Sequence, residues 1–294
     1  MEETWTILKV IQWTTGYFER KGIDQPRAGA EVLLAHVLGV ERLQLYLHHD
    51  KPLGQEELTR YREAVRRRAS REPVQYITQR QEFWSLELEV NPAVLIPRPE
   101  TELLVERALE ILGDLPARVL DLGTGSGAIA IAMAHEKPKI RVVASDRSLE
   151  AIAVARRNAS RHGVSDRIAF AAMDLFGGFA RDLEPFDLIV SNPPYIGEYE
   201  LMSLAPEVKC HEPPWALRGG GLDGLDTIRR ILAEAPGYLK PFGCLLMEIG
   251  HMQSDILDRE TALNGNFQEH RFFRDHSGIL RILQAVRNER VRNG

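Results

Sequence analysis

Cysteine is scarce in this chain of 294 residues, and long apolar stretches are absent. Its two cysteines, Cys210 and Cys244, lie far apart in sequence and form no CxxC pair, so the sequence predicts neither a disulfide framework nor a cysteine-based metal site. No apolar run approaches the roughly 18 residues that would indicate a membrane-spanning helix. We therefore expect a protein of the reducing cytoplasm that does not bind membranes.

An excess of positive charge is also missing. The chain has 37 Lys and Arg residues against 42 Asp and Glu residues, which gives a formal net charge of −5 and an isoelectric point near 6.0. Its first 72 residues carry 12 basic and 11 acidic side chains. This balance lacks the basic footprint typical of nucleic-acid-binding proteins, so we expect no direct nucleic-acid partner.

The length of the chain and its 44% hydrophobic residues predict two domains. Residues 1–72 have apolar side chains at helical spacing, which predicts a small all-helical domain. Residues 74–90 alternate between apolar and polar side chains and predict a β-hairpin within a linker at 73–95. Residues 96–294 then make up the larger domain.

The larger domain alternates strand and helix patterns. Strands are predicted at residues 118–122, 141–145, 168–172, 187–191, 244–249, 267–274 and 279–286. Repeated strand–helix units predict an α/β fold whose mostly parallel sheet is covered on both faces. The last two strands have no helix between them, which predicts an antiparallel hairpin at one edge. Residues 197–221, rich in Pro and Gly, predict an irregular loop of the kind that often acts as a lid.

A glycine-rich turn follows the first predicted strand of that domain. Gly123-Thr124-Gly125-Ser126-Gly127 places glycines where a strand passes into a helix, which lets backbone N–H groups approach a ligand closely. Asp146 ends the next strand, where a carboxylate can accept hydrogen bonds from both ribose hydroxyls of an adenosine. NAD(P) fits this pattern too, as does a tight turn without a ligand. Asp121 favours S-adenosylmethionine (SAM), because its charge attracts a cationic ligand and repels a pyrophosphate.

The strand at 187–191 ends in the tetrapeptide Asn192-Pro193-Pro194-Tyr195. Proline fixes φ and has no N–H group, so this turn is stiff and presents carbonyl acceptors. The Asn192 side-chain oxygen and the Pro193 carbonyl can each accept one hydrogen from a planar amino or amide nitrogen, while Tyr195 stacks on its π-system. That arrangement aims the remaining lobe of the nitrogen at a methyl donor and predicts N-methylation.

These motifs belong to four blocks that resemble a known family. The blocks are residues 82–84 (Glu-Phe-Trp), 95–102 (Leu-Ile-Pro-Arg-Pro-Glu-Thr-Glu), 121–127 and 192–195. The family is that of the release factor glutamine methyltransferases, also called PrmC or HemK enzymes, and the resemblance runs from about residue 72 to the C-terminus. It implies a class I SAM-dependent methyltransferase, Rossmann-like with a seven-stranded, mostly parallel sheet.

The resemblance also implies an activity. The enzyme would be a SAM-dependent protein-(glutamine-N5) methyltransferase acting in translation termination. Its substrate would be the glutamine of the Gly-Gly-Gln motif in bacterial peptide chain release factors, and its second product S-adenosylhomocysteine.

By the same resemblance, the site residues fall into three groups. The cofactor contacts are Gly123, Thr124, Gly125, Ser126, Gly127, Asp146, Leu175 and Asn192. The catalytic residues are Asn192, Pro193 and Tyr195. The substrate contacts are Asn192, Pro193, Pro194, Tyr195, Arg98 and Glu100. Leu175 stands where many relatives carry an aromatic residue beside the adenine, which leaves apolar packing in place of stacking.

Other functions stay open on the sequence alone. The turn at 192–195 also suits an exocyclic amine of DNA or RNA, although the charge balance argues against it. A ribosomal-protein glutamine methyltransferase would share the chemistry, and the block at 96–102 favours the release-factor enzymes. An NAD(P)-dependent oxidoreductase would leave the turn unexplained, and a binding module without activity is a further alternative.

The remaining expectations concern partners and metals. All cofactor motifs lie after residue 72, so we expect the helical domain to recognise the protein substrate, and we expect a monomer. Cys210, His211 and Glu212 are adjacent in sequence and cannot readily converge on one ion, so no metal site is expected.

Overall fold

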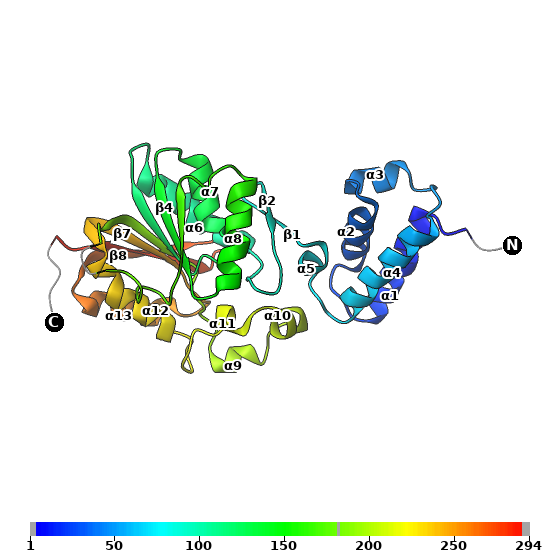
Figure 1. Cartoon of the computed structure of the whole chain (residues 1–294). Coiled ribbons are helices and arrows are strands. Elements are labelled where there is room, and N and C mark those ends of the chain that lie inside the picture. Colours follow the sequence, from blue (N-terminus) through cyan, green and yellow to red (C-terminus); the bar gives the residue numbers. More distant parts are fainter. Residues whose placement is uncertain (1–3, 181–182, 290–294) are drawn as a thin grey trace. The chain divides into compact units, whose positions relative to one another are not determined.

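The computed structural model describes residues 4–180 and 183–289, drawn as coloured ribbons in Figure 1. The outermost residues of the predicted domains, 1–3 and 290–294, lie outside the described residues. Within the part that is described, no helix is both long enough and apolar enough to cross a membrane.

The smaller of two compact units is helical and comprises residues 1–80 and 205–211. Its helices are α1 (Ile7–Arg20), α2 (Pro26–Leu38), α3 (Arg42–Leu47), α4 (Gln55–Ala69), α5 (Val74–Thr78) and α10 (Pro206–His211). Gly39 ends α2 at φ +67°, a left-handed conformation that glycine adopts without steric cost. Phe18 and Leu33 are fully buried in the core that these helices share.

Helix α10 belongs to this unit although it is distant in sequence. Arg68, at the end of α4, is buried and donates to the Glu207 carboxylate at 3.1 Å, and Arg71 donates to the same oxygen at 3.2 Å. His211 Nε2 lies 3.3 Å from the Ser70 carbonyl oxygen. No local sequence pattern indicates that this segment packs with helices more than a hundred residues earlier.

The linker is a hairpin only in its middle part, residues 80–89. Strands β1 (Arg80–Phe83) and β2 (Leu86–Glu89) form a two-stranded sheet, joined by Trp84 and Ser85 at φ +53° and +56°. The predicted hairpin is confirmed at residues 80–89, but the predicted strand pattern is wrong at residues 74–78, which form helix α5. Tyr76 and Ile77 are both buried, at 2% and 5% exposed. A helical turn can bury two adjacent side chains, which a half-exposed strand would send to opposite faces.

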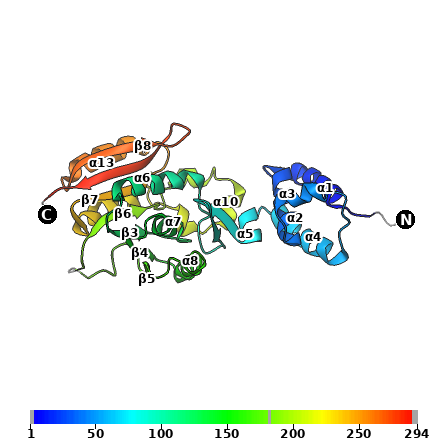
Figure 2. The same cartoon turned by 90° about the horizontal axis from the view of Figure 1, so that it is seen from above.

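The larger unit, residues 81–204 and 212–294, is built on a sheet of seven described strands, seen in Figure 1 and from above in Figure 2. In spatial order they are β5 (Ile168–Ala172), β4 (Arg141–Asp146), β3 (Arg118–Leu122), β6 (Phe186–Ser191), β7 (Leu239–Glu248), β9 (Leu280–Arg287) and β8 (Phe267–Arg274). The first five run parallel, whereas β9 is antiparallel to both of its neighbours. The predicted α/β fold and its antiparallel edge hairpin are confirmed.

Helices cover both faces of this sheet. The helices of this unit are η1 (Pro99–Thr101), α6 (Glu102–Leu112), α7 (Ala128–Glu136), α8 (Leu149–Arg161), α9 (Glu198–Leu201), α11 (Pro214–Leu217), α12 (Asp226–Glu234), η2 (Ala235–Gly237) and α13 (Ser254–Asn264), of which η1, α9 and α11 add no described residue to the apolar cores at the sheet. Val119 packs in a core with α6 and α7, and its neighbour Leu120 packs in a second core with α12 and α13. Both side chains are fully buried, as expected where successive strand residues point to opposite, covered faces.

The predicted irregular loop at 197–221 is wrong. It contains three short helices, α9, α10 and α11. Pro206 and Pro214 stand at the first positions of α10 and α11. At that position a fixed φ suits the helix and the missing N–H would have had no partner, so proline starts these helices.

Candidate active site

Three parallel strands bring the predicted site residues to one edge of the sheet. Strand β3 lies between β4 and β6, and Leu122 pairs in register with Ser145 on one side and Ser191 on the other. The glycine turn, Asp146 and Asn192 directly follow or end these strands. They therefore leave the sheet beside one another.

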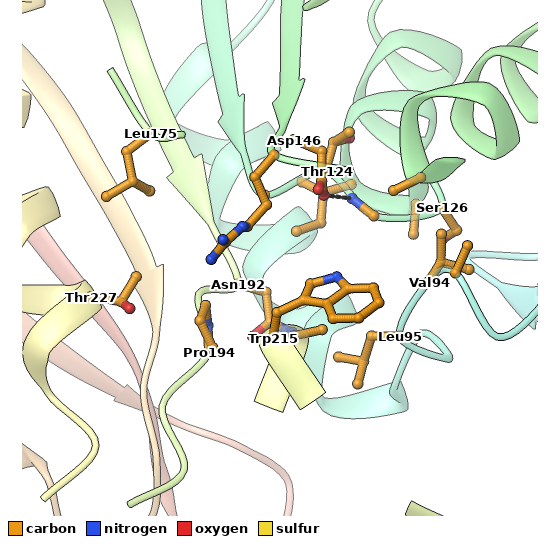
Figure 3. A pocket seen from close by; sticks show the side chains of 18 of the residues that line it. Val94, Leu95, Thr124, Ser126, Asp146, Leu175, Asn192, Pro194, Trp215 and Thr227 are labelled. Carbon is orange, nitrogen blue, oxygen red and sulfur yellow. Dashed lines mark hydrogen bonds between the residues drawn. The ribbon is translucent and has the colours of Figure 1, made fainter. Parts of the chain in front are cut away.

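A cavity of about 320 Å³ opens at this edge. Its lining includes eight of the predicted residues: Gly123, Thr124, Gly125, Ser126, Asp146, Leu175, Asn192 and Pro194. Figure 3 shows Thr124, Ser126 and Asp146 along one side, with Asn192, Pro194 and Trp215 across from them. Of the other predicted residues, five are outside the lining found among the described residues: Gly127, Pro193, Tyr195, Arg98 and Glu100.

The three glycines of the turn do different work. Gly123, Gly125 and Gly127 all have positive φ, at +71°, +55° and +85°. A Cβ at either of the first two would meet nothing within 4 Å, so the backbone there borders open space. At Gly127 a Cβ would come within 2.8 Å of Ile131 and 3.1 Å of Ala155 in α8. Gly127 therefore lets two helices pack closely, which does not require it to touch a ligand.

Asp146 is anchored by the backbone. Its Oδ2 accepts a hydrogen bond from the Gly125 N–H and its Oδ1 one from the Ser148 N–H, both at 2.9 Å. Burial raises the pKa of this carboxyl above its ordinary value, and the two N–H donors offset part of the rise. Each oxygen keeps a further lone pair, so the carboxylate can also accept hydrogen bonds from a ligand in the cavity.

Asp121, two residues before the glycine turn, lies inside the protein. It is fully buried, and its Oδ2 accepts a hydrogen bond from the Thr124 hydroxyl at 2.6 Å. Within the described residues, Oδ1 makes no hydrogen bond of normal geometry. Burial raises the pKa of Asp121 to about 7. An unpartnered buried carboxylate oxygen is costly unless a ligand or water completes its hydrogen bonding.

Asn192 belongs to a buried hydrogen-bond chain that the sequence did not predict. Its Nδ2 donates to the Thr101 hydroxyl at 3.0 Å, and that hydroxyl donates to Glu248 Oε2 at 2.7 Å. The Tyr195 hydroxyl donates to Glu248 Oε1 at 3.1 Å. Burial raises the pKa of Glu248, against the opposing hydrogen bonds from Thr101 and Tyr195. The sequence shows an acidic residue within the apolar run at 244–249, but it does not show that this strand lies next to β6.

The two substrate contacts predicted before α6, Arg98 and Glu100, are outside the cavity lining. Arg98 donates to the Glu212 carboxylate, which also accepts a hydrogen bond from the Ile96 N–H at 3.2 Å. Glu100 is exposed. This ion pair ties residues 96–98 to the segment that leads into α11, and α11 carries Trp215, a residue of the cavity lining that is 46% exposed.

The described residues around the cavity form no cluster of potential metal ligands. Across residues 4–180 and 183–289, no group of three or more His, Cys, Asp or Glu side chains is placed to hold an ion.

Comparison with known proteins addresses both units. The family description "PrmC N-terminal domain" matches residues 9–78, and "Methyltransferase small domain" matches residues 99–221. The resemblance therefore begins well before residue 72, where the sequence blocks had placed its start. The helical unit, which had no recognised motif, is included in it.

Curated relatives agree along most of the chain. It is similar to the release factor glutamine methyltransferase of Geobacter sulfurreducens, with 49% identity over 87% of this chain and 88% of that protein. The protein of the same name from Chlorobaculum tepidum is 45% identical over 97% of this chain and 98% of its own length. Among solved structures, the N-terminal domain of human METTL16 in complex with SAH matches with a TM-score of 0.52. It is 17% identical and covers 70% of this chain and 77% of that one, so it supports the methyltransferase fold alone.

Proposed function

The chain belongs to the release factor glutamine methyltransferase family, and we propose that it methylates the side-chain amide nitrogen of the glutamine in the Gly-Gly-Gln motif of peptide chain release factors. SAM is the methyl donor. The observation that carries the proposal is the position of Asn192, which lines the same cavity as the glycine turn and has its amide nitrogen committed to Thr101. Its oxygen is thereby left as the group that can accept a hydrogen from an incoming amide.

The residues of the cavity fit SAM. Open space beside Gly123 and Gly125 admits a ligand close to the backbone, and the Asp146 carboxylate is placed to accept hydrogen bonds from ribose hydroxyls. Leu175 adds apolar surface for the adenine. Asp121, the acidic residue expected from the sequence to attract the cationic ligand, is outside the cavity lining and its burial raises its pKa to about 7, so it acts on the site through its hydrogen bond from Thr124. When bound, SAM supplies a methyl group on a positively charged sulfur.

The turn at 192–195 would hold the glutamine. Asn192 lines the cavity and its Oδ1 would accept one N–H hydrogen of the substrate amide, and Pro194 shapes the adjoining wall. The second acceptor in this proposal is the backbone carbonyl of Pro193, a residue that is itself outside the lining. An amide nitrogen is a weak nucleophile because its lone pair is delocalised, so positioning is the main contribution. Orientation of this kind can supply roughly 7 to 11 kcal/mol.

No dedicated base is required in this scheme. Two acceptors on the amide stabilise positive charge that develops on the nitrogen during methyl transfer. The proton can then leave to solvent after the new bond has formed. Tyr195 contributes from behind the turn in this proposal, because its hydroxyl is bound to Glu248 and its side chain is outside the cavity lining.

The helical domain would recognise the protein substrate. It presents a groove of about 370 Å³ between α1 and α4, where the half-exposed Trp13 stacks on Tyr17 with ring centres 5.4 Å apart. An apolar groove with an accessible aromatic residue is the kind of surface that proteins bind. An enzyme that modifies release factors would work in the cytoplasm, where translation takes place.

One experiment tests the proposed function. Full-length protein is incubated with methyl-labelled SAM and equal amounts of release factor, ribosomal protein and DNA. We expect label on the release factor, and none after its Gly-Gly-Gln is changed to Gly-Gly-Glu, because that change removes the nucleophilic nitrogen. Label on the ribosomal protein or on DNA in place of the release factor would overturn it. A short Gly-Gly-Gln peptide with the same KM as the intact release factor would contradict the role of the helical domain.

A further inference from the structure

Glu248 is a deeply buried acidic side chain that is outside the cavity lining but is linked to it through Thr101. It is 1% exposed and stands at the end of β7, where Met247 pairs in register with Ser191 of β6. Asn192 is the first residue after β6. Glu248 thus lies behind the turn that reaches the cavity, and strand pairing fixes this placement.

The carboxylate accepts from two sides at once. Thr101 donates to its Oε2 at 2.7 Å, and Tyr195 donates to its Oε1 at 3.1 Å. A hydroxyl has a single hydrogen, so once Thr101 gives it to Glu248 it can only accept from its other neighbour. That neighbour is Asn192, whose Nδ2 lies 3.0 Å from the Thr101 oxygen.

The direction of the chain therefore decides which end of the Asn192 amide faces the cavity. While Glu248 is ionised and accepts on both oxygens, Asn192 must present its NH2 group to Thr101 and its oxygen to the other side. If the Thr101 hydroxyl were free to donate to Asn192, the amide could turn over and offer N–H groups where the proposed function needs an acceptor.

We propose that Glu248 is a positioning residue, which fixes the Asn192 amide through Thr101 and the Asn192-to-Tyr195 turn through the Tyr195 hydroxyl. The proposal rests on the proposed function only for what Asn192 then does to the substrate. The orientation itself is a property of these residues. Thr101 and Glu248 are buried, at 4% and 1% exposed, so a chain with the wrong polarity would leave a buried polar group without a hydrogen-bond partner.

Two substitutions test this without changing side-chain size much. Glu248→Gln can accept from only one of its two donors, so the polarity of the chain is no longer fixed. Thr101→Val removes the hydroxyl and keeps the shape, whereas Thr101→Ser keeps the hydroxyl. We expect kcat to fall on the order of tenfold in Glu248→Gln and in Thr101→Val, with the Kd for SAM changing less than about threefold. Thr101→Ser should retain most of the activity.

Thr261→Val is the matched control. Thr261 lies in α13, is 1% exposed, and its hydroxyl has no hydrogen-bond partner among the described residues. The same Thr-to-Val change there should leave kcat unaltered. Thermal unfolding of each variant establishes that the protein is folded at the assay temperature. If Thr101→Val does not fold, the kcat and the resonance shifts of Glu248→Gln test the proposal.

A second readout is independent of methylation. The side-chain N–H signals of Asn192, assigned by their absence in Asn192→Ala, should shift in Glu248→Gln and in Thr101→Val when followed by nuclear magnetic resonance. Unchanged signals together with full kcat would overturn the positioning role, and so would an equal loss in Thr101→Ser and Thr101→Val. Failure of the unaltered protein to methylate release factor would overturn the proposed function instead, and the resonance shifts would still test the orientation of Asn192.

Discussion

Arg98 and Glu212, 114 residues apart in sequence, form an ion pair in which the carboxylate is almost wholly buried. The Glu212 side chain is 1% exposed and that of Arg98 is 33% exposed. The pair joins the residues that precede α6 to the segment that begins α11, and both segments contribute to the cavity lining. The long connection after β6 is thus held at the site by a specific charge pair.

Arg98→Ala should destabilise the larger unit, because it leaves a buried carboxylate without its cation. We expect a loss of about 2 kcal/mol in the free energy of unfolding, below the usual cost for a fully buried pair since Arg98 is partly exposed. Urea denaturation measures it. Arg66→Ala, which breaks the exposed Arg66–Glu63 pair, is the control and should cost less than about 0.5 kcal/mol. Equal losses in the two variants would contradict the structural role.

Two alanine substitutions in the glycine turn should separate packing from binding. Gly127→Ala forces a methyl against Ile131 and Ala155 at φ +85°, so it should cost about 1 to 3 kcal/mol in stability. Gly123→Ala meets no atom within 4 Å, so its stability cost is limited to about 1 kcal/mol of backbone strain at φ +71°, and it should in addition weaken SAM binding by about tenfold because its methyl enters space beside the cavity. Thermal unfolding and calorimetric titration with SAM measure the two effects. The opposite order of effects would show that Gly127 is the ligand contact.

Asp146→Ala should weaken SAM binding by roughly 2 to 4 kcal/mol, because two charge-assisted hydrogen bonds to the ribose are lost. Calorimetry on the folded variant measures this. Part of the loss will come from the turn, since Asp146 also anchors the Gly125 and Ser148 N–H groups. S-adenosylhomocysteine should lose affinity to the same extent as SAM. An unchanged Kd would exclude the ribose assignment.

Asp121 should make stability depend on pH. Its pKa is raised from an ordinary value of 3.8 to about 7, so the folded chain binds this proton more tightly than the unfolded chain. The resulting stability is fully present below about pH 4 and is lost as the pH rises through about 7. Asp121→Asn cannot ionise at this position. The free energy of unfolding of this variant, relative to that of the unaltered protein, should therefore rise by on the order of 2 kcal/mol from about pH 5 to about pH 8.

Urea denaturation of both proteins at about pH 5 and at about pH 8 checks the prediction for Asp121. The exposed Asp166 offers a matched substitution, Asp166→Asn, which should show no such difference. A constant gap between Asp121→Asn and the unaltered protein across this range would contradict the burial-driven shift.

The strands of the larger unit were predictable because their apolar runs end at clear turn residues. Strands at 118–122, 168–172 and 267–274 match the structure residue for residue. The residues that leave β3, β4 and β6 could also be identified, since parallel strands deliver their carboxyl ends to one edge. Local spacing carries that information without any knowledge of the tertiary fold.

The supporting residues could not be predicted in this way. Thr101 and Glu248 are 147 residues apart, and only the spatial order of β6 and β7 makes them neighbours. The same holds for Arg68 and Glu207, which join α10 to the helical unit. Helix α5 was missed for a different reason: five residues are too few to show a helical period, and tertiary packing of Tyr76 and Ile77 decides their conformation.

Mass spectrometry of the product peptide tests the central claim most directly. Release factor is incubated with the full-length protein and SAM, digested, and the Gly-Gly-Gln peptide is fragmented. The proposed mechanism predicts a single added CH2 group on the glutamine side chain, abolished when the substrate glutamine is replaced by asparagine, which withdraws the nitrogen by one methylene. A methyl group on a lysine or on the backbone, or unaltered modification of the asparagine substrate, would contradict it.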